Sequence, residues 1–88
     1  MRILKYTLHE YGAAILDLPE GSHILSVADQ CGALQLWAEA DTNKTKEARK
    51  IHVVFTGDDA PEGKYIGTAL TSGGNIVRHV YDATHPKD

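Results

Sequence analysis

The sequence predicts a mostly β protein, a small antiparallel β-sandwich or barrel of about seven short strands. Runs rich in Val, Ile, Leu, Thr and aromatic residues recur along the chain, and few of them reach helical length. Clusters of Gly, Pro, Asp and Asn separate these runs, as turns do. The 88 residues show no repeat of fixed period, so a single domain over residues 1–88 is expected.

Alternation of side chains between two faces predicts where each strand lies. Pro19 lacks a backbone donor and ends the second strand. The fifth run is rich in β-branched residues and apolar on both faces, which is typical of a central strand. The expected strands are residues 2–8, 13–18, 23–30, 33–40, 50–56, 65–71 and 75–82.

Two short connections predict hairpins. Cys31-Gly32 suits a two-residue loop in which Gly supplies a positive φ, and Ser72-Gly73-Gly74 is a second hairpin signal. Residues 41–49 are polar throughout and are expected to form a loop, although a helical turn is an alternative. Residues 83–88 are expected to be a flexible tail.

Composition excludes several classes of protein. Nine basic and twelve acidic residues give a charge of -3, which disfavours binding to duplex nucleic acid. No run approaches the roughly 18 apolar residues of a membrane-spanning helix, so no membrane partner is expected. The single cysteine forms no internal disulfide and fits a cytoplasmic location. So small a core favours a homo-oligomer.

No catalytic, metal or cofactor motif emerges from the residues. The five histidines lack a ligand spacing, Cys31 lies in an expected turn, and no nucleophile elbow or phosphate-binding glycine loop is present. The carboxylates of residues 58–62 are expected to form a solvated acidic turn. The chain is therefore predicted to be no enzyme and to need no cofactor.

Aromatic and cationic residues could together bind a nucleotide, because bases stack on rings and arginine bonds phosphate through a bidentate fork. Period two places Arg78 and His79 on opposite faces of the last strand, so they should not serve one pocket of one subunit. Trp37 and Tyr81 could instead belong to the core. The proposed ligand-binding residues are Trp37, Arg49, Thr56, Gly57, Tyr65, His79 and Tyr81.

Six features of the sequence carry a resemblance to known proteins. They are ILKYTL, LPEGSHILSV followed by Gln30, LWA at residues 36–38, Arg49 before a strand ending in Thr56-Gly57, YIGT at residues 65–68, and HVY at residues 79–81. Through them the chain resembles a family of short uncharacterised proteins of bacteriophages and prophages. The resemblance spans nearly the whole chain, and none of these stretches is a known catalytic motif.

By general character the chain also resembles the sponges with which phages sequester nucleotide immune signals. That resemblance implies a non-catalytic protein that holds an ADP-ribose derivative or cyclic dinucleotide in a pocket of a homo-oligomer and so blocks host defence. Trp37 or Tyr65 would stack the base, Arg49 would meet phosphate, and Thr56 and Gly57 would add hydrogen bonds. The alternatives are an accessory protein that inhibits a host protein by edge-strand pairing and, ranked last, a small nucleotide hydrolase.

Overall fold

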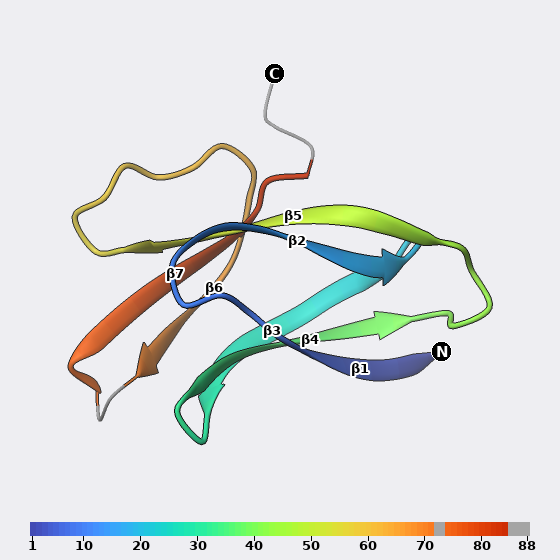
Figure 1. The fold of residues 1–88 in the computed structure, drawn as a ribbon, viewed down its shortest axis with the longest axis horizontal. Coiled ribbons are helices and arrows are strands. Elements are labelled where there is room, and N and C mark those ends of the chain that lie inside the picture. Colours follow the sequence, from blue (N-terminus) through green and yellow to red (C-terminus); the bar gives the residue numbers. More distant parts are fainter. Residues whose placement is uncertain (72–73, 85–88) are drawn as a thin grey trace.

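The computed structural model describes residues 1–71 and 74–84 of the chain (Figure 1). The described residues form seven strands and no α-helix, which confirms the predicted mostly β class. The strands are β1 (Arg2–Thr7), β2 (Gly12–Pro19), β3 (His23–Gln30), β4 (Ala33–Ala40), β5 (Lys46–Phe55), β6 (Lys64–Thr71) and β7 (Ile76–Asp82).

The strands build two antiparallel sheets, as a small β-sandwich requires. One sheet has the order β1-β4-β3, and the other has the order β2-β5-β7-β6, so β5 is a central strand as its composition predicts. The sheets approach each other most closely where β3 runs beside β6 (Figure 1). We call the sheets the three-stranded and the four-stranded sheet.

The core lies between the two sheets and is built by alternate residues of each strand. In β4, Leu34, Leu36 and Ala38 point inward and are buried, as the alternation predicts. In the four-stranded sheet, Val53 of β5 and Val80 of β7 are opposite each other and equally buried. Burying a side chain of this size stabilises the fold by about 1.5–3 kcal/mol.

The predicted hairpin between β3 and β4 is confirmed. Cys31 and Gly32 have φ values of 53° and 87°, so both central residues of the turn, and not Gly32 alone, are left-handed. Strands β6 and β7 also pair as predicted, although residues 72–73 of their connection lie outside the described residues.

The expected loop over residues 41–49 is wrong for its second half, because β5 already begins at Lys46. Leu16 and Leu18 of β2 pair with Arg49 and Glu47, so backbone pairing continues although the side chains are polar. Residues 46–49 form a strand because they pair with β2. They lack the alternation of apolar residues by which a strand is recognised in a sequence.

The prediction of a flexible tail over residues 83–88 is wrong for its first two residues, Ala83 and Thr84. The backbone N–H of Ala83 donates to the carbonyl of Lys50 at 2.8 Å, and Thr84 accepts a hydrogen bond from the N–H of Lys50 at 2.9 Å. These two residues therefore extend the pairing of β7 with β5, whereas residues 85–88 lie outside the described part. No helix in that part is long and apolar enough to cross a membrane.

Candidate functional site

A polar pocket of about 280 Å³ opens between the two sheets at one end of the sandwich. We call it the polar pocket. Its walls come from the beginnings of β3 and β6, from β5 and from the end of β7. The lining residues are Ser22, His23, Ile24, Arg49, Lys64, Tyr65, Ile66 and Asp82.

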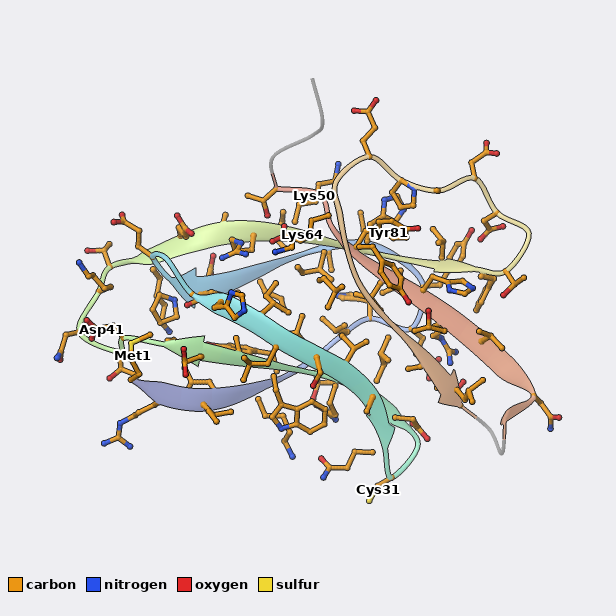
Figure 2. The ribbon with its side chains drawn as sticks, turned by 180° about the vertical axis from the view of Figure 1, so that it is seen from behind. Met1, Cys31, Asp41, Lys50, Lys64 and Tyr81 are labelled. Carbon is orange, nitrogen blue, oxygen red and sulfur yellow. The ribbon has the colours of Figure 1, made fainter. Side chains whose placement is uncertain are left out.

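Strand register brings these residues to the same end. Asp82 of β7 pairs with Ile51 of β5 on one side and with Lys64 of β6 on the other. Gly63 lets the chain enter β6 at this point, because its φ is +128° and an added Cβ would lie 2.8 Å from the Cα of Ala83. Figure 2 shows Lys64 and Tyr81 on these neighbouring strands.

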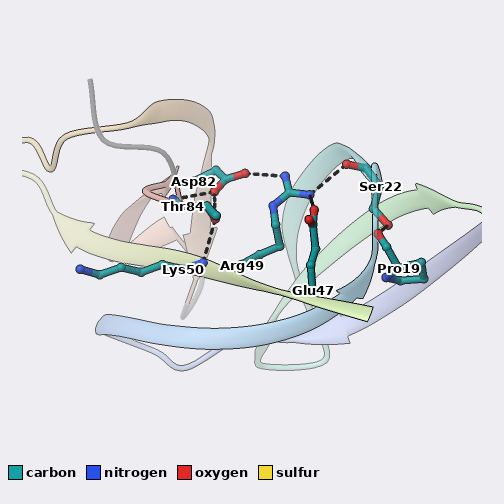
Figure 3. A network of polar contacts seen from close by, with 7 residues as sticks. All are labelled: Pro19, Ser22, Glu47, Arg49, Lys50, Asp82 and Thr84. Carbon is teal, nitrogen blue, oxygen red and sulfur yellow. Dashed lines mark hydrogen bonds and ion pairs between the residues drawn. The ribbon is translucent and has the colours of Figure 1, made fainter. Parts of the chain in front are cut away.

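An ion pair forms the floor of the polar pocket (Figure 3). Nη2 of Arg49 donates to Oδ2 of Asp82 at 2.6 Å, and Nη1 donates to the carbonyl of Ser22 at 3.1 Å. The side chains of Arg49 and Asp82 are only 13% and 14% exposed. Arg49 thus ties β5 to β7 and to the turn before β3.

Asp82 is held in its ionised form by its neighbours. Burial raises the pKa of this carboxyl group, but hydrogen bonds from the Thr84 hydroxyl, from Arg49 and from the Thr84 N–H, together with the charge of Arg49, lower it more. The pKa of Asp82 therefore lies below its ordinary value. An ionised Asp82 keeps the guanidinium of Arg49 in place.

The rim of the polar pocket carries two further basic side chains, Lys64 and His23, both exposed. Neither forms an ion pair within the described part of the chain. Arg49 and Lys64 together outweigh the single lining carboxylate, Asp82, while the whole chain carries a charge of -3. Among the lining residues, basic groups therefore outnumber carboxylates, and Glu47, outside the lining, also lies 3.6 Å from Arg49.

Beside the pocket, the outer face of the four-stranded sheet carries a chain of hydrogen bonds that we call the His79 network. His79 bonds Thr56 through Nε2 at 2.8 Å and Thr68 through Nδ1 at 3.0 Å. The hydroxyl groups of Thr68 and Tyr65 are 2.5 Å apart, and the ring centroids of Tyr65 and Tyr81 are 5.5 Å apart in an edge-to-face arrangement. Tyr65 belongs to both the network and the pocket.

The structure brings most of the proposed site residues together, in two groups. Arg49 and Tyr65 line the polar pocket, while Thr56, His79 and Tyr81 join Tyr65 on the outer face. Thr56 lies seven residues from Arg49 along an extended segment, or roughly 23 Å at about 3.3 Å per residue. Thr56 and Gly57, which directly follows it, are therefore too far away to share a phosphate with Arg49.

Trp37 lies on a different surface. It alternates with the buried Leu36 and Ala38 of β4, so its half-buried side chain is on the outer face of the three-stranded sheet, with Lys5 and Ser26 as register neighbours. It belongs neither to the polar pocket nor to the core between the sheets. Within one chain, Trp37 and Arg49 cannot contact the same ligand.

Arg78 points inward, opposite to His79, as period two predicts. Its side chain is buried, donates from Nε to the carbonyl of Glu10 at 2.6 Å and from Nη1 to the Thr71 hydroxyl, and lies 5.6 Å from the centre of the Phe55 ring. Arg78 therefore links the crossover from β1 to β2 with the four-stranded sheet. This role is structural.

A larger hollow of about 400 Å³ lies where β5 ends and β7 begins, and no charged side chain lines it. Its lining residues are Phe55, Thr56, Asn75, Ile76 and Val77. Recognition of a charged ligand needs fixed polar groups in the wall. The smaller polar pocket is therefore the better candidate site.

Other reactive side chains show no catalytic arrangement in the described residues. Cys31 is exposed at the tip of the β3–β4 hairpin, far from Lys64 (Figure 2). Asp58 accepts hydrogen bonds from the Phe55 N–H at 2.9 Å and from the Tyr11 hydroxyl at 3.1 Å, so it stabilises its own turn. Among residues 1–71 and 74–84, no three His, Cys, Asp or Glu side chains are grouped to hold a metal ion.

Fold and pocket together define a class, a small antiparallel β-sandwich with a polar pocket between its sheets. The model of a family described as a domain of unknown function, DUF7352, matches residues 1–88, so the chain belongs to the DUF7352 family. Searches of the curated proteins and of the solved structures found no match.

Three residues that line the polar pocket, His23, Lys64 and Asp82, are not among the ligand-binding residues predicted from the sequence. Lys64 directly precedes Tyr65, so this cation next to an aromatic ring was a usable local signal. His23 and Asp82 reach the pocket only through the placement of β3 beside β6 and the pairing of β7 with β5. The sequence around His23 and Asp82 therefore does not indicate that they line a pocket.

Proposed function

We propose that this chain is a non-catalytic binding protein for a small phosphate-bearing ligand of the nucleotide type, which it holds in the polar pocket. The observation that carries the proposal is the gathering of Arg49, Lys64, His23 and Tyr65 around one cavity of an otherwise acidic chain. Charge-assisted hydrogen bonds and stacking are the two interactions that a nucleotide requires.

In this proposal, Lys64 and His23 meet the phosphate directly. Arg49 does not bind the phosphate as predicted from the sequence, because its guanidinium already donates hydrogen bonds to Asp82 and Ser22. It fixes the floor and contributes positive potential. Tyr65 is 52% exposed, and its ring contacts Tyr81 on the outer face of the sheet, where it would stack a base that extends out of the pocket.

The polar pocket is large enough to enclose part of such a ligand. Ligand pockets usually measure about 300–1,000 Å³, and the polar pocket measures about 280 Å³. A phosphate with its sugar fills such a volume, and the base lies outside on Tyr65. The proposed ligand is an ADP-ribose derivative or a cyclic dinucleotide.

The biological role that we propose is sequestration of a nucleotide immune signal by a phage-encoded protein. Sequestration needs tight binding without turnover, so binding groups alone are sufficient for it. The polar pocket supplies binding groups, and the hydroxyl of Ser22, which lines it beside His23, donates to the carbonyl of Pro19. This role does not require the ligand to change chemically.

Thermal-shift measurements with ADP-ribose and cyclic di-AMP test the proposal. We expect one of them to raise the melting temperature, and we expect chromatography of the heat-denatured complex to recover it intact at protein stoichiometry. Altered ligand would show that the protein is an enzyme. If neither compound nor a wider panel of nucleotides shifts the melting temperature, the proposal that the pocket binds a nucleotide is wrong.

A further inference from the structure

Four strands form the edges of the two sheets, and three of these edges are blunted against pairing with another chain. An open edge presents unpaired backbone groups, and proteins usually protect it with a bulge or with charged side chains. Strands β3 and β6 each contain a bulge and run beside each other. Strand β1 carries Arg2 and Lys5 within its six residues.

Strand β2 has fewer of these protections. Its eight residues pair with β5 in an unbroken register, and Asp17 is its one charged residue. Its other side pairs with no strand in the described part of the chain. Ile15 is 60% exposed on its outer face. We infer that β2 is the surface through which two copies of this chain pair, antiparallel and edge to edge.

The register of this pairing follows from Pro19. Proline has no N–H for a ladder, so the longest antiparallel overlap that omits it runs from Gly12 to Leu18 and centres on Ile15. Ile15 then lies opposite the partner's Ile15 on the outer face. On the inner face, the half-buried Ala14 lies opposite the partner's Leu16. Apolar side chains on both faces lose solvent exposure.

The position of the charged residue Asp17 is compatible with the same register. Asp17 lies opposite the partner's Ala13, whose neighbour across the sheet is the partner's His52. The small alanine leaves room for the carboxylate to approach that imidazole across about 10 Å between Cα atoms. The two Asp17 residues are four positions apart along the ladder, or about 13 Å, so their repulsion is weak.

Cysteine cross-linking tests the register directly. Facing residues of an antiparallel pair have Cα atoms about 4.5–5.5 Å apart, within the range that a disulfide spans. In a Cys31→Ser background, Ile15→Cys should give a disulfide-linked dimer under mild oxidation. Leu70→Cys is the matched control, because Leu70 is similarly exposed on β6, the opposite edge of the same sheet. It should remain largely monomeric.

Sedimentation analysis supplies a second measurement that does not involve cysteine. The parent chain should be a dimer, Ile15→Lys should be a folded monomer by circular dichroism, and Leu70→Lys should remain a dimer. A parent chain that is monomeric up to its solubility limit would overturn the inference. So would a Leu70→Cys variant that cross-links as fast as Ile15→Cys. Neither result depends on which ligand the polar pocket binds.

Discussion

Arg49 donates a hydrogen bond of 2.6 Å to Asp82, and this contact joins β5 to β7 beneath the polar pocket. Breaking a buried ion pair by removing one partner costs about 3–5 kcal/mol, and the partial exposure of this pair reduces that figure. We expect Asp82→Ala to lower the free energy of unfolding by about 2 kcal/mol. Urea denaturation measures it.

Glu47 provides the control for this prediction. It lies 3.6 Å from Arg49, but its side chain is 40% exposed. Exposed ion pairs contribute about 0–1 kcal/mol, so Glu47→Gln should change the free energy of unfolding by less than about 0.5 kcal/mol. Equal effects of the two substitutions would contradict the account of the pocket floor.

The lowered pKa of Asp82 predicts a specific acid sensitivity. A carboxyl group whose pKa is lower in the folded state stabilises the fold above its unfolded pKa. This contribution is lost as the pH falls below the ordinary value of 3.8 and through the folded pKa. Urea unfolding between neutral pH and about pH 2 should show this loss in the parent chain. Asp82→Asn should lack it; the same acid slope in both proteins would be evidence against the assignment.

Gly63 is expected to tolerate substitution less well than another glycine with positive φ. A Cβ at residue 63 would meet the backbone of Asp82 and Ala83, whereas a Cβ at Gly21 would meet nothing within 4 Å. A left-handed non-glycine residue costs roughly 1–2 kcal/mol. Gly21→Ala should cost about that amount and Gly63→Ala clearly more, as measured by thermal unfolding. Similar losses would mean that β6 can shift to make room.

Arg78 is expected to be essential for stability and not for ligand binding. Its substitution by Met keeps most of the apolar stem but removes the hydrogen bonds to Glu10 and Thr71. Leaving buried acceptors without a partner costs about 1–3 kcal/mol. Arg78→Met should therefore lower the midpoint of urea unfolding, while ligand affinity at temperatures where the protein is folded stays unchanged. A selective loss of affinity would give Arg78 a binding role.

Local patterns in the sequence predicted most of the fold. The bounds of β3 and β4 agree residue for residue with the expected ranges, because alternation along each strand and the Cys31-Gly32 turn are short-range features. The alternation does not reveal the start of β5, because polar Glu47 and Arg49 occupy the positions that continue the buried face of Ile51 and Val53.

The candidate site was less predictable because it depends on which strands become neighbours. Arg49 and Tyr65 share the polar pocket although they lie on strands that do not pair with each other. Trp37 is predicted to join them because it is aromatic, but β4 belongs to the other sheet and the Trp37 side chain lies on its outer face. Sheet membership is set by long-range packing, which residue types alone do not encode.

The most direct test of the central claim is the affinity of Lys64→Gln for whichever of ADP-ribose and cyclic di-AMP the parent chain binds, measured by titration calorimetry. Lys44→Gln is the matched control, since Lys44 is an exposed lysine in the connection between β4 and β5, outside the pocket. Loss of a charge-assisted contact with phosphate should weaken binding by about tenfold or more. The account predicts this loss for Lys64→Gln and unchanged affinity for Lys44→Gln. Equal affinity of both variants and the parent chain would contradict it.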